Sequence, residues 1–187
     1  MSNFLLHGPA PIVHIHIPKT GGSTIRLGLW GKDKYTGPVF GDVPEDWRSH
    51  WSFMMVRHPM ERWWSAWRDF NFIRGFKSTP DEFAKITICE DIPWVGFDGT
   101  REGHIRHHTA PITAHEAVKR ADKVYRYPDE YDVAVREVLL RAGRNIPETF
   151  PRLRETPKTD APKLSPDVEE ALRGFYKADS EAFGFSL

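Results

Sequence analysis

Cysteine is nearly absent from this sequence of 187 residues, which holds only Cys89. A single cysteine cannot close an intrachain disulfide or build a multi-cysteine zinc site, so nothing here requires an oxidising compartment. Net charge is absent as well, because 26 Lys and Arg balance 26 Asp and Glu. Without an overall positive field we expect no nucleic-acid partner, and any anion site must be local.

Long apolar runs are also missing. No stretch approaches 18 consecutive apolar residues, and the segment from Met1 to Pro9 lacks the basic start and apolar run of a signal peptide. We therefore expect no membrane span and a cytoplasmic protein. Apolar residues still make up 40% of the chain and charged residues 28%. These proportions allow a buried core, and the length predicts a single domain over residues 1–187.

Two strand-turn-helix units can be recognised in the first half of the chain. Residues 12–17 form a β-branched strand that runs through a glycine turn into a helix near residues 25–30. Residues 51–56 form a second apolar strand, and Pro59 then begins a helix with apolar residues at intervals of three and four. Strands that alternate with helices predict an α/β fold with a mostly parallel sheet.

The second half of the sequence predicts one more strand and three more helices. The strand is expected at residues 122–127, and the helices begin near Pro80, Pro128 and Ser165. Residues 90–113 are rich in glycine and histidine, and we expect an irregular functional loop or partial lid there.

An anion cradle is predicted at the first glycine turn, over Pro18, Lys19, Thr20, Gly21, Gly22, Ser23 and Thr24. The glycine pair lets the backbone turn tightly and approach a ligand, and the N–H groups at a helix start favour an anion. Lys19 adds a full charge, while the three hydroxyls add donors. This combination suits phosphate or sulfate. The alternative is an ordinary turn that needs glycine for its geometry alone.

The order of the residues argues against an ordinary ATPase, because the Walker A lysine follows the last glycine whereas Lys19 precedes Gly21. The run from His16 to Thr24, His-Ile-Pro-Lys-Thr-Gly-Gly-Ser-Thr, instead resembles the 5′-phosphosulfate loop of sulfotransferases that use 3′-phosphoadenosine 5′-phosphosulfate (PAPS). The likeness is greatest to the branch related to carbohydrate O-sulfotransferases.

This resemblance implies a second motif, an Arg followed eight positions later by a Ser, which both bind the 3′-phosphate of the cofactor. Arg57 and Ser65 have that spacing. His58 stands where the family usually has Asp, a departure that affects only the role of position 58. Independently, an arginine at the carboxyl end of a strand suits a phosphate dianion. The alternative is that Arg57 pairs with a carboxylate such as Glu61 and that Ser65 only fills a helix position.

The resemblance further implies the fold and the reaction. The fold would be a P-loop-like three-layer α/β sandwich with four or five mostly parallel strands. The reaction would be direct in-line transfer of a sulfuryl group from PAPS to an acceptor hydroxyl, which leaves adenosine 3′,5′-bisphosphate. Lys19 would stabilise the charge that grows on the bridging oxygen. The acceptor would be a carbohydrate or small molecule, with a peptide tyrosine also open.

The general base is the weakest element of this prediction. Family members often place a His after a Gly between the two phosphate motifs, and here Asp42 follows Gly41 in that place. Asp42 is therefore the candidate base, or else it caps a turn. The other candidates are histidines: His50, His104, His107 and His108. Their spacing matches no standard ligand pair, so we expect no metal.

Two rival functions stay open at this point. A nucleotide kinase would use the same cradle, but it needs magnesium ligands and a conventional lysine placement that the sequence lacks. A non-catalytic nucleotide-binding module would keep the cradle without a base, and the change at Asp42 favours that rival.

Overall fold

The computed structural model describes residues 1–31, 33–91, 99–150 and 162–187. Its contacts divide the chain into two compact units. Unit 1 combines Met1–Arg57 with His115–Glu155, and unit 2 combines His58–Ala114 with Thr156–Leu187. The single domain expected over residues 1–187 stays a prediction.

Unit 1 is built on a five-stranded sheet with the order β3-β1-β2-β4-β5. Its strands are β1 (Ser2–Leu6), β2 (Ile12–His16), β3 (Tyr35–Phe40), β4 (Ser52–Val56) and β5 (Lys123–Arg126). Strand β1 pairs antiparallel with both β2 and β3, whereas β2, β4 and β5 pair in parallel. The sheet is therefore mixed. The expected α/β fold with four or five strands is confirmed at this level, while the three-layer P-loop arrangement stays a prediction.

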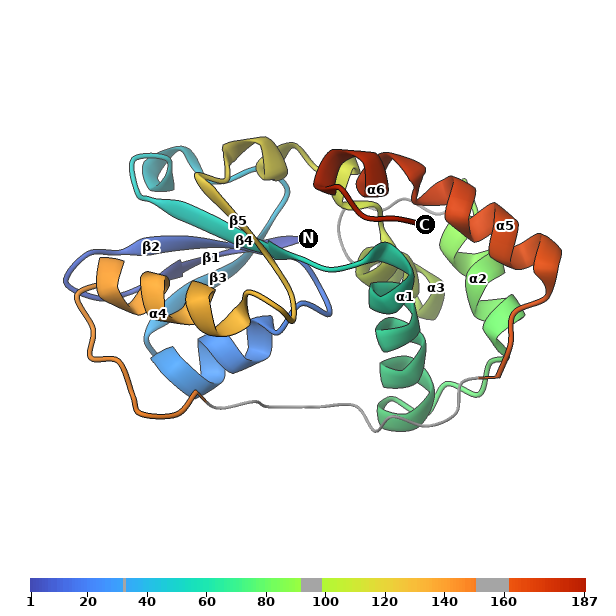
Figure 1. Ribbon diagram of the computed structural model, residues 1–187, viewed down its shortest axis with the longest axis horizontal. Coiled ribbons are helices and arrows are strands. Elements are labelled where there is room, and N and C mark those ends of the chain that lie inside the picture. Colours follow the sequence, from blue (N-terminus) through green and yellow to red (C-terminus); the bar gives the residue numbers. More distant parts are fainter. Residues whose placement is uncertain (32, 92–98, 151–161) are drawn as a thin grey trace. The chain divides into compact units, whose positions relative to one another are not determined.

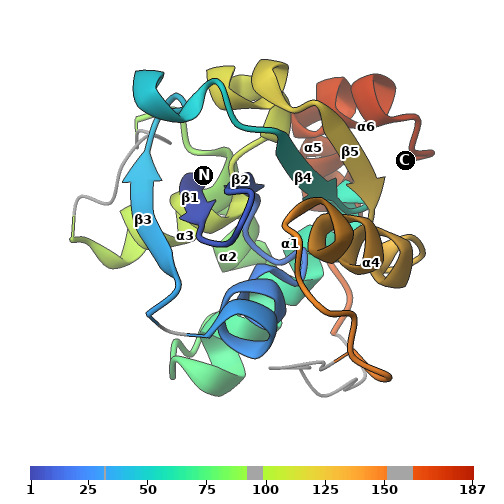
Figure 2. The same cartoon turned by 90° about the vertical axis from the view of Figure 1, so that its left-hand side faces the viewer.

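Figure 2 shows a strong twist in this sheet, in which the edge strands β3 and β5 point in opposite directions across the view. Twist of one hand accumulates over successive strands because each strand is itself twisted. Here it brings the carboxyl end of β3 near the amino end of β5, since Asp42 and Arg120 form an ion pair between the two segments.

Two helices cover one face of the sheet in unit 1. They are the π-helix η1 (Thr24–Trp30) and α4 (Tyr131–Arg141), which lie on the same side of the strands in Figure 1. Ile25 and Trp30 of η1 share a buried core with Val135 of α4 and with Phe4 and Phe53 of the sheet. This face of the sheet is therefore fixed by apolar burial. Two short 3₁₀ turns, η2 (Glu45–Trp47) and η5 (Glu116–Arg120), precede β4 and β5.

Unit 2 is helical. It contains α1 (Pro59–Arg68), η3 (Asp69–Ile73), α2 (Pro80–Ile88), α3 (Arg101–Thr109), η4 (Ile112–Ala114), α5 (Pro166–Phe175) and α6 (Lys177–Phe183). The helices meet in a core that includes Trp63, Phe70, Phe83, Leu172 and Tyr176. The helix starts predicted at Pro59, near Pro80 and near Ser165 are confirmed. Pro59, Pro80 and Pro166 each stand in the first turn, and Ser165 is the N-cap of α5.

A buried carboxylate ties the last helix of unit 2 to the segment after α3. Asp179 accepts hydrogen bonds from the N–H groups of Ile112 and Thr113 at 2.8 and 2.9 Å. The Arg62 guanidinium lies 3.8 Å away and also donates to the Ala110 carbonyl at 2.7 Å. Both charged side chains are fully buried, so each depends on the other for compensation.

The sequence prediction for residues 90–113 was wrong in part, because Arg101–Thr109 form the helix α3. Its first turn is capped by Thr100, whose hydroxyl accepts the N–H of Gly103 at 2.9 Å. The helix has no regular apolar stripe, and Ile105 alone supplies a large buried aliphatic side chain. The segment from residue 92 to 98 lies outside the described residues. No described helix is long and apolar enough to cross a membrane.

Candidate functional site

The predicted anion loop follows β2 directly and has an unusual backbone. Lys19 adopts φ +70° although it is not glycine, and Gly21 adopts φ +81°. A left-handed residue with a side chain costs free energy and is retained where the surrounding structure demands it. The Gly21 carbonyl accepts the N–H groups of Thr24 and Ile25 at 3.0 and 3.4 Å, which starts the helix. The expected strand, glycine turn and helix are therefore present.

The hydroxyls of the loop differ in their surroundings. Thr20 is fully buried and donates to the Ile17 carbonyl at 2.7 Å, so its proton stabilises the loop itself. Thr24 is also buried, whereas Ser23 is partly exposed. Pro18 is buried. Of the three predicted hydroxyl donors, Ser23 is thus the most accessible to a ligand.

Gly22 has no room for a side chain. A Cβ built there would lie 2.1 Å from His16 Cδ2, 2.4 Å from His16 Nε2 and 3.0 Å from Arg26 Nη1. Contacts below about 3 Å force a neighbour to move, so the glycine is required by these two side chains. The histidine of the motif thus packs directly on the loop backbone.

The two predicted phosphate motifs meet at one aromatic ring in unit 1. Arg57 follows β4 and Tyr127 follows β5, where the Tyr127 N–H donates to the Val56 carbonyl at 2.7 Å. The Arg57 Cζ lies 5.5 Å from the centre of the Tyr127 ring. A Cβ on Gly21 would lie 2.9 Å from Tyr127 Cε2, so the same ring touches the anion loop. Sequence reasoning missed Tyr127, although its place after a third parallel strand is a signal.

The remaining residues of the second motif belong to unit 2. Ser65 lies on α1 with its side chain buried, and its pairing with Arg57 on one phosphate stays a prediction. His58 donates from Nε2 to the Ser186 carbonyl at 2.6 Å, and its ring packs on Phe185 at 5.7 Å. The residue that departs from the family pattern therefore holds the segment after α6.

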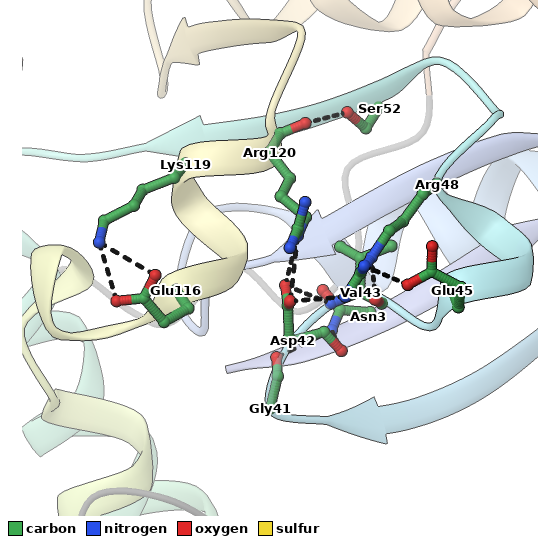
Figure 3. Close-up of polar contacts among 10 residues, drawn as sticks. All are labelled: Asn3, Gly41, Asp42, Val43, Glu45, Arg48, Ser52, Glu116, Lys119 and Arg120. Atoms are coloured by element: carbon green, nitrogen blue, oxygen red, sulfur yellow. Dashed lines mark hydrogen bonds and ion pairs between the residues drawn. The ribbon is translucent and has the colours of Figure 1, made fainter.

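Asp42, the predicted base, lies in an ion-pair cluster (Figure 3). Its Oδ1 accepts from Arg120 Nε at 2.8 Å, and its Oδ2 accepts from Arg48 Nη2 at 3.0 Å. The Val43 N–H donates to the same carboxylate at 2.8 Å. The hydrogen bond from Arg120 is the main reason that the pKa of Asp42 is lowered. A carboxylate held this way is a weak proton acceptor, so the geometry opposes the predicted role.

Three of the other candidate bases gather on α3 in unit 2. His104 contacts Arg74 Nη1 through Nε2 at 2.8 Å, and its ring packs on His108 with centroids 4.9 Å apart. Burial lowers the pKa of His104, and it lowers the pKa of His107 to about 4. Both imidazoles are therefore neutral at pH 7. Over the described ranges, no group of three or more His, Cys, Asp or Glu side chains is arranged to hold a metal ion.

Comparisons with known proteins give little for this chain. No family model matches it, and no curated protein is significantly similar. A search of solved structures finds a sulfotransferase from Alicyclobacillus acidocaldarius, with 17% sequence identity and a TM-score of 0.39. The match covers 76% of this chain, which spans only 59% of that protein. Values this low do not establish a shared family or function.

Proposed function

We propose that the protein is a sulfotransferase that moves a sulfuryl group from PAPS to an acceptor hydroxyl and leaves adenosine 3′,5′-bisphosphate. One observation carries the proposal: the Tyr127 ring contacts both Gly21 of the anion loop and the Arg57 guanidinium. The resemblance to sulfotransferases implies that these two residues bind the 5′ and the 3′ phosphate of one cofactor. A shared contact supports a single ligand that carries both groups.

The loop residues supply the binding and the charge that this reaction needs. The backbone around Gly21 and Gly22, with Ser23 and Thr24, would hold the 5′-phosphate, and Lys19 would stabilise negative charge on the oxygen that leaves sulfur. The donor supplies the activated sulfuryl group. Direct in-line transfer then needs no covalent link to the protein. A carbohydrate or small-molecule alcohol is the proposed class of acceptor.

Proton removal from the acceptor requires a base. Asp42 is the candidate from the sequence, but its two arginine partners oppose that role. Burial lowers the pKa of His104 and, to about 4, that of His107, so these imidazoles are also weak proton acceptors. They are tested together with His50 and His108. Single alanine variants identify the base as the histidine whose loss lowers turnover while affinity for the bisphosphate is unchanged.

A non-catalytic nucleotide-binding module is the second candidate, because the ion-paired Asp42 leaves the cradle without the base that its position predicted. An assay for transfer of the labelled sulfuryl group from PAPS to candidate acceptor alcohols separates the two functions. Binding of bisphosphate without transfer to any alcohol supports the module.

Selective binding of a ligand with a 3′-phosphate tests the proposed cofactor. Adenosine 3′,5′-bisphosphate at a hundredfold excess over its dissociation constant should stabilise the protein by about 2.7 kcal/mol, and ADP at equal concentration should do much less. Arg57→Ala removes a charge-assisted contact worth about 1.5–3 kcal/mol, so it should abolish most of this preference. Arg136→Ala is the matched control, since Arg136 also lies over an aromatic ring, that of Phe150, at 5.7 Å. Equal binding of ADP and bisphosphate by the wild type contradicts the proposal.

A further inference from the structure

Residues 71–78 of unit 2 form a closed loop that leads from η3 to α2. The Asn71 amide closes it, because its Oδ1 accepts the Ser78 N–H at 2.7 Å and its Nδ2 donates to the Ser78 hydroxyl at 3.2 Å. The Trp67 indole N–H donates to the Ser78 carbonyl at 3.2 Å. The two ends of the 71–78 loop are therefore joined to each other and anchored on α1.

Packing also fixes the inner side of this loop. The Phe76 ring stacks on Phe70 with centroids 5.2 Å apart, and the Phe76 N–H donates to the Phe70 carbonyl at 2.9 Å. Arg74 Nε donates to Asp69 at 2.8 Å, and Arg74 Nη1 contacts His104 Nε2 at 2.8 Å. These contacts to η3 and α3 hold the loop in a defined conformation.

Two large apolar side chains of the same loop face solvent. Phe72 is 56% exposed and Ile73 is 57% exposed. The Phe72 ring meets Trp67 edge to face, with centroids 5.7 Å apart, so one side of the ring is supported by α1. Apolar surface that a well-packed loop keeps in water is typical of a binding surface.

Basic side chains lie next to this apolar pair. Lys77 of the loop lines a surface cavity of about 350 Å³ together with Lys85 of α2 and Arg101 of α3. All three side chains are exposed. The Arg101 guanidinium lies over the Phe76 ring, with Cζ 4.5 Å from its centre. A guanidinium stacked in this way directs its N–H groups sideways, where they can donate to an oxyanion.

Two carboxylates, Glu82 and Glu102, line the same cavity. Glu82 accepts the N–H and the hydroxyl of Thr79 at 2.8 and 3.0 Å, so it is engaged in the cap of α2. The three cations therefore outnumber the acids of the described lining. The result is positive charge beside an exposed apolar pair.

An anionic lipid bilayer fits this surface better than a folded protein does. A stable protein interface buries about 800 Å² on each partner, from about 20–30 residues. Among the described residues of unit 2, only Phe72, Ile73 and Leu187 are exposed large hydrophobic residues. A bilayer requires less, since a few apolar side chains below the headgroups and nearby Lys or Arg give reversible binding.

We propose that the 71–78 loop docks unit 2 on an anionic bilayer. Phe72 and Ile73 enter the boundary between headgroups and acyl chains, while Lys77, Lys85 and Arg101 contact the anionic headgroups. The attachment is to one leaflet and is made by a surface loop. It does not depend on the proposed sulfotransferase function.

Sedimentation with lipid vesicles tests the proposal. Wild type should bind vesicles of phosphatidylcholine with about 30% phosphatidylserine at least about tenfold more tightly than vesicles of phosphatidylcholine alone, because each basic residue near the surface contributes about fivefold. Higher salt should weaken this binding. Equal binding to the two kinds of vesicle, or none to the anionic ones, overturns the proposal.

Two double variants test the two parts of the surface. Phe72→Ala/Ile73→Ala should lower the affinity for anionic vesicles by about tenfold or more, because both side chains lose their apolar burial. Lys77→Gln/Lys85→Gln should lower it by about tenfold or more as well, and should make binding less sensitive to salt. Wild-type affinity in either folded variant overturns the proposal.

Matched controls change the same chemistry elsewhere. Val133→Ala/Leu140→Ala alters two residues of α4 in unit 1 that are each 61% exposed, and Lys34→Gln/Lys163→Gln removes the same charge from two other exposed lysines. Both controls should bind anionic vesicles within about twofold of wild type, since neither touches the loop. Losses as large as those of the loop variants contradict the role of the loop. Circular dichroism and melting temperature establish that every variant is folded.

Sedimentation of the protein without lipid decides between a bilayer and a second copy of the chain. If wild type self-associates and Phe72→Ala/Ile73→Ala abolishes this, while vesicles bind neither protein, the loop is a protein contact and the bilayer proposal is rejected. None of these assays uses PAPS, so their outcome is separate from that of the proposed function.

Discussion

The Asp42 carboxylate and the Arg120 guanidinium form an ion pair across 78 residues of sequence, with Arg120 Nε 2.8 Å from Oδ1 and 3.0 Å from Oδ2. Arg48 binds the same carboxylate from the other side. The pair connects the turn after β3 with the turn before β5, so it links the two edge strands of the twisted sheet in unit 1.

This geometry predicts a structural effect for Asp42→Asn. The variant and Arg120→Gln should each lower the melting temperature by a few degrees, with the larger effect in Asp42→Asn, which also weakens the pair with Arg48. The double variant should lose little more than Asp42→Asn alone, because the Asp42–Arg120 pair is already broken in that variant. Turnover should stay within about threefold of wild type in all three. A drop of about a hundredfold in Asp42→Asn alone, with Arg120→Gln unaffected, would restore Asp42 as the base.

Two substitutions at Lys19 should separate the effect of its charge on turnover from the effect of its backbone strain on stability. Lys19→Ala is expected to lose at least about a hundredfold in turnover with the fold intact, because a transition-state charge contact contributes about 3–4 kcal/mol. Lys19→Gly should lose as much turnover but be more stable than Lys19→Ala by about 1 kcal/mol, since glycine adopts φ +70° without strain. Rate assays with PAPS and urea denaturation measure the two effects. Near-normal turnover in a folded Lys19→Ala rejects the assigned role.

Gly22→Ala should damage the loop through His16. The new methyl group would lie 2.1 Å from the imidazole, so the variant should melt at a lower temperature and bind the bisphosphate poorly. Truncation of the ring in the Gly22→Ala/His16→Ala double variant should recover stability. Gly174→Ala is the control, because nothing lies within 4 Å of its Cβ position. If the double variant is no more stable than Gly22→Ala, the contact with His16 is not the cause.

Two buried histidines predict a loss of stability in mild acid. Burial lowers the folded-state pKa of His14 and His107 from the ordinary value of 6.5. Above pH 6.5 both are neutral whether folded or unfolded. Below pH 6.5 the two histidines bind protons in the unfolded chain but stay neutral in the folded protein. The free energy of unfolding therefore falls by up to about 1.4 kcal/mol per pH unit for each histidine, until the pH reaches the folded-state pKa.

Hydrogen exchange at about pH 7.5 and about pH 5.5 checks this prediction for each unit separately. His14→Phe keeps a ring against Phe53, on which His14 stacks at 4.7 Å, and it should flatten the pH dependence of unit 1 only. An unchanged slope in that variant assigns the acid sensitivity to other groups.

Asp179 should be a major source of stability in unit 2. Asp179→Ala removes the acceptor for Ile112 and Thr113 and leaves the buried Arg62 without its counter-charge, which predicts a loss of about 3–5 kcal/mol. Glu181→Ala, on the same helix, breaks only an exposed pair with Lys177 and should cost less than about 1 kcal/mol. Chemical denaturation compares them, and similar values would contradict the role of Asp179.

The sequence predicted those elements whose local pattern agrees with their place in the fold. Strand β4 is apolar from Phe53 to Val56, as expected for a strand with both faces buried, and α2 carries a capping box of Thr79 and Glu82. Strands β1 and β3 were not predicted. The segment from Ser2 to Leu6 has no clean alternation, and β3 contains Gly37 and Pro38, which usually mark turns. Both segments form strands because they pair with neighbouring strands in the sheet.

The candidate site shows the same division. The loop and Arg57 were recognisable because their residues are adjacent in sequence and their spacing is specific. Tyr127 and Arg120, the distant partner of Asp42, were not, because each acts through a contact between segments far apart in the chain. Local spacing carries no information on which ring or guanidinium the sheet twist brings to a given turn.

Both edges of the sheet are built in a way that discourages pairing with another molecule. At one edge β3 contains Pro38, which has no N–H to donate to an added strand. At the other edge β5 has only four residues, and its exposed Lys123 and Arg126 would repel the same strand of a second copy. An exposed edge is the usual template for aggregation of mixed sheets. Because β1 lies inside the sheet, with β3 outside it, the two edges are the strand with Pro38 and the four-residue β5. Both are poor templates for the addition of another strand.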